Sequence, residues 1–451
     1  MRLINIKTLQ LEEFTINPPQ YAILSHTWGV DEVTFADFSN PSRRARRARQ
    51  RKSGWAKIAG VCKQALKDKY DYVWVDTCCI DKSSSTELSE AINSMYSWYA
   101  HSGICYAYLE DVAYPSLGRR LSAREDQAWY DFGQPFANSR WYRRGWTLQE
   151  LVAPRSVTFY DKSWVHIANR SEIAGRLSQI TGIPSDVLGI RMTARSYPVG
   201  HRLSWAAGRR TTRPEDIAYS LMGLLNINMP LLYGEGTKAF LRLQEEVLRQ
   251  HEDDSLFLWC SARGCDDRLS QLRGLLADSP DDFANFLDNR YYTFRRMERK
   301  GQRAVTDIRP SPALNTAVSV DSRGVRFDGH EKRPQVSGPE NNGMWLCQMN
   351  CRIFGRPVSL YLQPVGPYRY GRARPSDIFI GSEHNSCEPA EIRTEPIILL
   401  KNDDAVRRHL LDEEHVYVSN VHEGGSPCTI STFERDGLPV RFQYVSPTSF
   451  L

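Results

Sequence analysis

Residues 21–29, YAILSHTWG, decide the fold that we predict for the first part of this chain. The apolar run YAIL is typical of a short buried strand, and the Trp-Gly pair ends it in a loop. Three further β-type runs follow, at residues 71–76 (DYVWVD), 104–109 (ICYAYL) and 156–160 (SVTFY). Helical segments separate these runs, a pattern of βαβ crossovers that predicts an α/β fold with a mostly parallel sheet flanked by helices.

The segments between the first three strands have the periodicity of amphipathic helices. Residues 54–69 repeat apolar side chains at every third or fourth position, and Ser53 precedes them as the expected N-cap. Residues 86–101 show the same spacing. Ligands of such sheets bind in the crevice beyond the carboxyl ends of the strands. We therefore expect residues 25–29 and 76–82, which follow two of the strands, to share one edge of the sheet.

The rest of the chain changes character twice. Residues 165–250 are predicted to be helical, and short β-type runs separated by Gly, Pro, Asn and Asp follow them, as in an antiparallel sandwich or barrel. These runs lie at residues 313–320, 324–327, 344–354, 358–365, 397–400, 415–419 and 438–445. The sequence thus predicts an α/β domain at residues 1–165, a helical extension at residues 166–290 and a mainly β region at residues 291–451.

The composition is typical of a soluble globular protein with two or three domains. Of its 451 residues, 41% are hydrophobic and 25% are charged. The chain has no uninterrupted apolar run of the roughly 18 residues that a membrane span needs. Glu12 and Glu13 interrupt the region in which a signal peptide would be apolar. We therefore predict no membrane span and a cytoplasmic location.

Residues 43–52, RRARRARQRK, contain seven basic residues in ten. Such a run is typical of a nuclear-localisation signal, of a nucleic-acid-binding patch, or of a solvated insertion between two elements. The run has no aromatic side chain on which a base could stack, and the net charge of the whole chain is only +5. We favour the solvated insertion, keep nuclear import as the alternative, and expect no nucleic-acid partner.

Familiar motifs for metal, nucleotide-hydrolysis and hydrolase sites are missing from the sequence. Residues 234–238, GEGTK, lack the spacing of a phosphate-binding loop, and there is no G-x-S-x-G, HExxH or CxxC. We therefore predict no metal site and no bound cofactor. Cys78 and Cys79 are candidate nucleophiles with His26 or His101 as the base, but cysteines at a strand end are more often core residues.

Residues 139–152, SRWYRRGWTLQELV, are the most informative stretch for chemistry. One interpretation is structural, with Thr147 and Glu150 forming the capping box of a helix. However, Pro154 leaves room for only a very short helix, and three arginines and two tryptophans crowd around one carboxylate. A carboxylate beside a flat ring and cations is suited to hold a ribose and to stabilise positive charge at its anomeric carbon. The residues alone leave both interpretations open.

These blocks resemble a known family. YAILSHTWG, DYVWVDTCCIDK and RGWTLQELVAP occur in the order and spacing of the fungal heterokaryon-incompatibility (HET) domain, and the resemblance continues through residues 87–112. Residues 202–259 resemble the helical extension that often follows this domain. The resemblance implies non-self recognition, in which an incompatible partner or allele product triggers programmed cell death. Many relatives add a nucleotide-binding oligomerisation module and WD repeats, which these 451 residues lack, so we expect the trigger to come from the C-terminal region or a partner.

HET domains are in turn similar to TIR domains, which are flavodoxin-like sheets, some of which cleave NAD. SRWYRRGWTLQEL resembles the TIR segment with a Ser-x-Trp-Cys-Leu-x-Glu-Leu pattern, so the resemblance implies that Glu150 is the catalytic residue and NAD the substrate. It implies that five residues form the substrate-binding site, namely Ser25, Trp28, Asp76, Arg144 and Trp146. The alternative is a death-signalling module without catalysis, which acts by self-association and recruits effectors.

Overall fold

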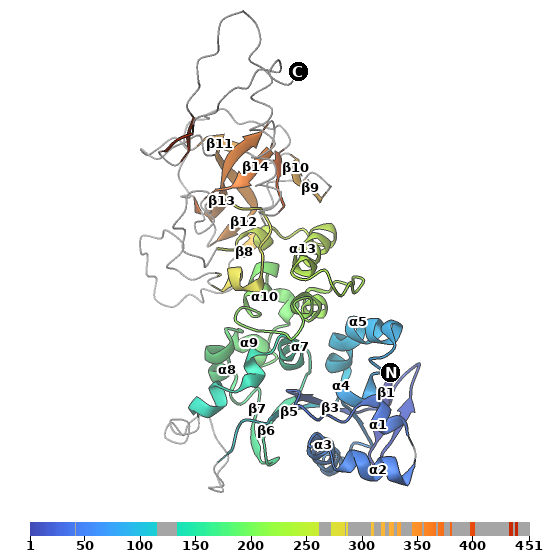
Figure 1. The fold of residues 1–451 in the computed structure, drawn as a ribbon. Helices are drawn as coiled ribbons and strands as arrows, with labels where there is room; N and C mark the ends of the chain where they lie inside the picture. The colour runs from blue at the N-terminus through green and yellow to red at the C-terminus, as the bar shows by residue number, and fades with distance from the viewer. Residues whose placement is uncertain are drawn as a thin grey trace, which may run out of the picture.

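The computed structural model describes residues 1–260 apart from residue 41 and residues 115–132, together with residues 272–284 and residue 286. Beyond residue 307 it describes the strands and a few single residues beside them. Figure 1 shows three parts along the chain: a sheet with helices, a helical part, and a second sheet. The helical part lies between the two sheets.

The N-terminal part is built on a seven-stranded sheet with the order β2-β1-β4-β3-β5-β6-β7. Neighbouring strands β4, β3, β5 and β6 are parallel, which confirms the predicted α/β class with a largely parallel sheet. In chain order these four strands follow the 2-1-3-4 arrangement of flavodoxin-like sheets. The strands are β1 (Arg2–Asn5), β2 (Gln10–Glu13), β3 (Ala22–His26), β4 (Tyr72–Trp74), β5 (Ile104–Leu109), β6 (Val157–Asp161) and β7 (His166–Asn169).

Helices cover both faces of the parallel strands. Every residue of β3 and β6 is buried, as expected for strands that have helices on both sides. Figure 1 shows α3 and α5 on opposite sides of the strands, where the two crossovers from β3 to β4 and from β4 to β5 place them. The helices of this part are α1 (Phe35–Ser39), α2 (Arg43–Gln50), α3 (Trp55–Lys67), α4 (Asp76–Cys79), α5 (Ser85–His101) and α7 (Thr147–Val152).

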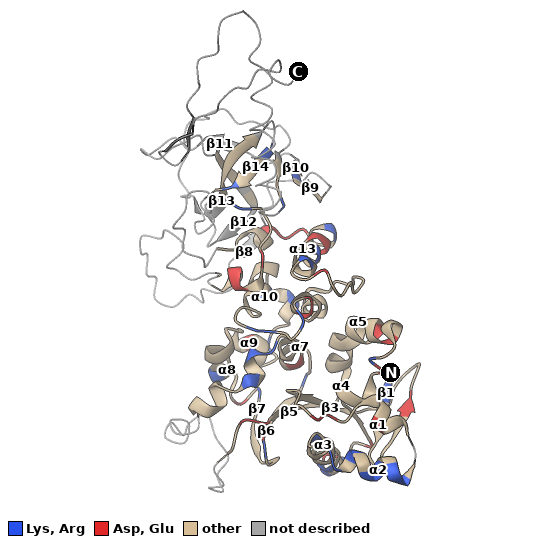
Figure 2. Ribbon diagram, in the orientation of Figure 1, with Lys and Arg blue, Asp and Glu red and all other residues tan. Residues whose placement is uncertain are grey.

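The basic run at residues 43–52 is mostly a helix. Ser42 caps α2, whose exposed face carries most of the arginines, and Figure 2 shows this helix in blue. Arg49 is the exception: it is buried, its guanidinium lies 4.0 Å from the ring centroid of Phe38, and it donates to the carbonyl of Leu9 at 2.9 Å. One member of the run therefore holds α2 against the fold.

The predicted N-cap of α3 is wrong by one residue. Gly54 occupies the cap position and gives no side-chain hydrogen bond. The hydroxyl of Ser53 instead donates to the carbonyl of Asp31 at 3.3 Å, because the loop after β3 folds back against the start of α3.

The helical part consists mostly of short helices, which confirms the helical prediction from residue 174 onwards. The prediction is wrong at the start of the range 165–250, because His166–Asn169 form β7 and pair with β6. The helices of the helical part are α8 (Ala174–Thr181), α9 (Ser185–Leu188), α10 (Val199–Ser204), α11 (Asp216–Tyr219), α12 (Met222–Leu225) and α13 (Lys238–Gln250), with 3-10 turns at Ala194–Ser196, Asp254–Phe257 and Pro280–Phe283. Helix α12 packs on α5, so the helical part contacts the N-terminal part directly.

The C-terminal part contains a second sheet, in which the described strands number nine and all but one neighbouring pair are antiparallel. It comprises β8 (Ile308–Pro310), β9 (Ala317–Val320), β10 (Val325–Asp328), β11 (Lys332–Pro334), β12 (Trp345–Ile353), β13 (Arg356–Gly366), β14 (Arg369–Arg372), β15 (Phe379–Ile380) and β16 (Ile397–Leu399); β17 (Phe433–Arg435) and β18 (Leu438–Val440) form a separate hairpin. The predicted strand at residues 415–419 lies outside the described residues. The domain limits at residues 165 and 290 stay predictions.

No helix among the described residues combines the length and the apolar character needed to span a membrane.

Candidate functional site

The candidate site lies at the carboxyl ends of the central parallel strands. Ser25 is in β3, Trp28 follows that strand, and Asp76 follows β4 as the first residue of α4. Helix α7 brings Glu150 to the same place, where the hydroxyl of Ser25 donates a hydrogen bond to Glu150 Oε2. The indole Nε1 of Trp141 donates to Ser25 Oγ at 2.8 Å, which orients the Ser25 hydroxyl towards the carboxylate.

The capping-box interpretation of residues 147–150 is wrong. Helix α7 begins at Thr147 after Trp146, and its N-cap has no side-chain hydrogen bond. The hydroxyl of Thr147 points back to the carbonyls of Trp141 and Arg144. Because the carboxylate of Glu150 turns to β3 and not to the start of its own helix, its contacts are tertiary.

The surroundings of Glu150 favour its protonated form. Only 7% of the residue is exposed, and burial raises the pKa of its carboxyl group to about 8. The negative charge of Asp76 adds to this shift, while hydrogen bonds from Ser25 and Tyr99 and the positive charge of Arg144 oppose it. A carboxyl group with this pKa is mostly neutral at pH 7 and becomes a carboxylate when a nearby positive charge develops.

The ring of Trp28 contacts Asp76, and two cations, Lys82 and Arg144, lie near that ring. The indole Nε1 of Trp28 donates to Asp76 Oδ2 at 2.7 Å, and 42% of Trp28 is exposed, so a ligand can reach the ring from solvent. The ammonium of Lys82 lies 3.5 Å from the centroid of this ring, and the guanidinium of Arg144 lies 5.6 Å from it. The arrangement offers a flat face for a base or pyridine ring and positive charge for a phosphate.

A second group of ionisable residues, namely His26, Glu32 and Lys57, lies beside Asp76. The sequence analysis named His26 only as a candidate base for the two cysteines and did not name Glu32 or Lys57. His26 Nδ1 is 3.8 Å from Asp76 Oδ1, and its Nε2 is 3.9 Å from Glu32 Oε2. Burial lowers the pKa of His26, so its ring is neutral at pH 7. Lys57 completes the group, with its ammonium 2.6 Å from Glu32 Oε1 and hydrogen-bonded to the carbonyl of Thr27. The sequence feature that could have assigned His26 to the site is its position in the YAILSHTWG block, one residue after Ser25.

The cysteines next to this site are core residues in character. Cys78 and Cys79 are buried, and burial raises the pKa of the Cys78 thiol well above its usual value. Such a thiol is a poor nucleophile. His101 contacts its own helix, with Nδ1 2.7 Å from the carbonyl of Ser97. These contacts favour the core interpretation of the two cysteines.

Trp146 lies at the contact between the N-terminal and helical parts. Its indole is close enough to the carboxylate of Asp216 in α11 to lower the pKa of that group, against the larger effect of burial, which raises it. The structure therefore brings together Ser25, Trp28, Asp76, Arg144 and Glu150, and places Trp146 against the helical part.

The comparisons with known proteins agree with the three sequence blocks. Residues 21–150 match the family model of the heterokaryon incompatibility protein (HET). The chain is similar to the vegetative incompatibility protein HET-E-1 of Podospora anserina, with 44% identity over 233 residues, which are 51% of this chain and 16% of that protein. No solved structure matches the chain. Residues 21–150 are therefore similar to the heterokaryon incompatibility (HET) domain, and the chain spans only 16% of the length of the relative that it matches.

Proposed function

We propose that this chain acts in heterokaryon (vegetative) incompatibility, as a non-self recognition protein that triggers programmed cell death in the cytoplasm. The similarity to a protein named for vegetative incompatibility supports this role. We further propose that the HET domain acts as an NAD glycohydrolase of the TIR type, with Glu150 as the catalytic residue. The single observation that carries the enzymatic proposal is the buried Ser25–Glu150 hydrogen bond beside the exposed Trp28 ring.

The proposed reaction splits the bond between nicotinamide and ribose. The C–N bond breaks, its electron pair leaves with nicotinamide, and the ribose becomes an oxocarbenium-like cation. Glu150, ionised, stabilises that cation, and water then adds to the anomeric carbon and releases a proton, giving ADP-ribose. Trp28 provides the flat face for a ring of the substrate. Asp76 accepts hydrogen bonds from ribose hydroxyls, and Arg144 pairs with a phosphate.

The hydrogen bond from Ser25 has a defined part in this scheme. Since Trp141 donates to Ser25, the Ser25 hydroxyl keeps its own proton directed at Glu150 and stabilises the ionised carboxylate. The raised pKa of Glu150, about 8, means that the active ionised form is a minority at pH 7. We therefore expect the rate of nicotinamide release to rise with pH until it levels off above pH 8.

The test compares nicotinamide release from NAD by the full chain, its Glu150→Gln variant and its Glu90→Gln variant, followed by liquid chromatography. Glu90 is an exposed residue of α5, so the second variant makes the same chemical change away from the site. We expect release by the unchanged chain and by Glu90→Gln, and a loss of at least about 100-fold in Glu150→Gln. Equal release by all three proteins contradicts a catalytic Glu150.

A second candidate function is a death-signalling module without catalysis, which acts by self-association and recruits effectors. The observation in its favour is the burial of Glu150 and of Ser25, which is 0% exposed. Val30, fully exposed in the loop after Trp28, offers an apolar contact for a second molecule. When expressed in a fungal host, Glu150→Gln still kills the cell if this candidate is correct, whereas the catalytic proposal requires survival.

A further inference from the structure

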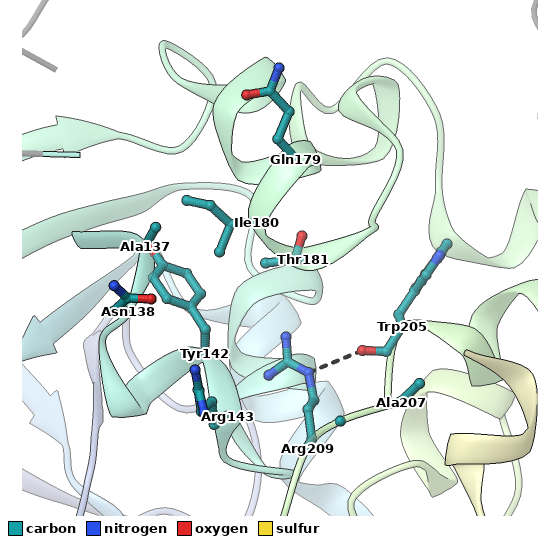
Figure 3. Close-up of a pocket in the computed structure, with 11 residues that line it drawn as sticks. Ala137, Asn138, Tyr142, Arg143, Gln179, Ile180, Thr181, Trp205, Ala207 and Arg209 are labelled. Carbon is teal, nitrogen blue, oxygen red and sulfur yellow. Dashed lines mark hydrogen bonds between the residues drawn. The ribbon is translucent and has the colours of Figure 1, made fainter. Parts of the chain in front are cut away.

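A cavity of about 420 Å³ lies between the N-terminal part and the helical part. Figure 3 shows its walls: the 3-10 turn η1 (Arg140–Arg143) on one side, and α8 and the segment after α10 on the others. None of Ser25, Trp28, Asp76 and Glu150 lines it, so it is separate from the candidate site. The side chains that matter for its chemistry are Tyr142, Arg143, Thr181 and Arg209.

Arg209 is a buried cation without a carboxylate partner among the residues that the structure describes. It is 4% exposed, and no Asp or Glu oxygen within the described part lies within 4.0 Å of its guanidinium. Nε donates to the carbonyl of Trp205 at 3.0 Å, and Nη1 donates to the carbonyl of Arg144 at 3.0 Å and to Thr147 Oγ1 at 3.2 Å. Nη2 has no hydrogen-bond partner within the described part of the chain, and Figure 3 shows the guanidinium directed towards Tyr142 and Thr181.

Two further side chains of the cavity lack a partner in the described ranges. The hydroxyl of Tyr142 is buried and makes no hydrogen bond there, although a buried hydroxyl normally finds one. Arg143 is exposed and its guanidinium makes no ion pair with a described residue. The lining contains no Asp or Glu, so no acidic side chain of the cavity wall balances the positive charges of Arg209 and Arg143. Glu150, outside the cavity, adds a Coulombic attraction to Arg209 but makes no ion pair with it within the described part of the chain.

Burying a guanidinium without a counter-ion has an unfavourable desolvation free energy, and an anion that binds in the cavity offsets it by pairing with the charge. Arg209 offers the two N–H donors of Nη2, and Arg143 supplies a second charge, which together match a doubly negative phosphate better than a singly negative carboxylate. The volume exceeds that of a free phosphate, and Ile180 and Ala207 supply apolar walls for an organic group.

We propose that this cavity is a binding site for a phosphate monoester of a small organic molecule, held by Arg209, Arg143 and Tyr142. The ligand would contact the HET domain directly through Tyr142 and Arg143, and Arg209 connects it to Thr147 at the start of the helix that carries Glu150. The site does not depend on the proposed NAD chemistry.

Isothermal titration of the full chain with phenyl phosphate tests the proposal. We expect saturable binding that is weakened at least about tenfold in Arg143→Gln, which removes one charge from an exposed residue. Binding is also expected to be lost in Ala207→Phe, which fills the cavity. Arg191→Gln is the matched control, since Arg191 is exposed and outside the cavity, and it should bind like the unchanged chain.

The affinities of inorganic phosphate and of benzoate then show how much the phosphate group and the aromatic ring of the ligand each contribute to binding. Phenyl phosphate should bind more tightly than either, because inorganic phosphate lacks the ring and benzoate carries one charge. No saturable binding of phenyl phosphate, or equal binding by Arg143→Gln and Arg191→Gln, overturns the site. Benzoate binding as tightly as phenyl phosphate overturns its assignment to phosphate.

Discussion

The carboxyl group of Glu150 couples the stability of the fold to pH. Its pKa rises from 4.5 to about 8 on burial. Between these values the folded chain keeps a proton that the unfolded chain has lost, so the free energy of unfolding falls as pH rises. The contribution is fully present below about pH 4.5 and is lost above about pH 8, with a slope of at most about 1.4 kcal/mol per pH unit.

Glu150→Gln should remove this dependence, because an amide does not titrate. Urea unfolding at pH 5.5, 7 and 8.5 measures it: the variant should gain stability relative to the unchanged chain as pH increases. Glu90→Gln should follow the unchanged chain at every pH. A constant difference between Glu150→Gln and the unchanged chain over this range would mean that Glu150 is already ionised in the folded protein.

The same residue shows what sequence reasoning can and cannot reach. The Thr-x-x-Glu spacing is a sound local signal for a capping box, yet Thr147 bonds to Trp141 and Arg144, and Glu150 bonds to Ser25. That partner lies 125 positions earlier in the chain. No local pattern encodes such a contact. The arginines and tryptophans around Glu150 left a chemical role open, and the resemblance to TIR domains then made Glu150 the expected catalytic residue.

At the scale of elements, one glycine sets how closely α12 approaches α5. A Cβ added at Gly223 would lie 2.1 Å from Tyr96 Cβ and 2.6 Å from its Cγ. Neither atom is the end of a flexible side chain, so the helices must move apart. We expect Gly223→Ala to lower the free energy of unfolding by about 1–3 kcal/mol, although alanine by itself favours a helix.

Gly175→Ala in α8 is the matched variant, because Gly175 also occupies the second position of a helix and has open space around it. Its free energy of unfolding should stay the same or rise by up to about 1 kcal/mol. Urea unfolding of both variants gives the comparison. A similar stability for the two variants would show that α12 does not pack against α5 at this distance.

The elements that the sequence predicted well are those buried on both faces. Strands β3, β4, β5 and β6 appear as continuous apolar runs, since helices cover both of their sides. The hairpin of β1 and β2 was not predicted, because these strands have only four residues each, lie at the end of the sheet with β2 as its edge, and mix charged or polar with apolar residues. Helix α2 was not predicted for a related reason. Its buried residue is an arginine, Arg49, so the sequence shows no apolar residue at the buried position that would distinguish it from the other arginines.

At the scale of the whole molecule, the three parts share one continuous cluster of buried apolar side chains, from Leu3 to Leu399. Arg372 of β14 joins the second sheet to the helical part. It is 1% exposed, donates to the carbonyls of Phe257 at 3.0 Å and Trp259 at 2.5 Å, and lies 4.0 Å from the ring centroid of Trp259. No sequence pattern indicated this contact, because its partners lie more than 110 positions away.

Arg372→Met should therefore weaken the contact between the second sheet and the helical part more than it destabilises the second sheet itself. The methionine fills similar space but leaves both carbonyls without their donor, at a cost of about 2–4 kcal/mol. Limited proteolysis with mass spectrometry should show faster release of a fragment that contains the HET domain. Arg369→Met, in the same strand at a half-buried position, should change the rate less. If the two variants are cleaved equally fast, the buried contacts of Arg372 do not hold the parts together, and the shared apolar cluster must do so alone.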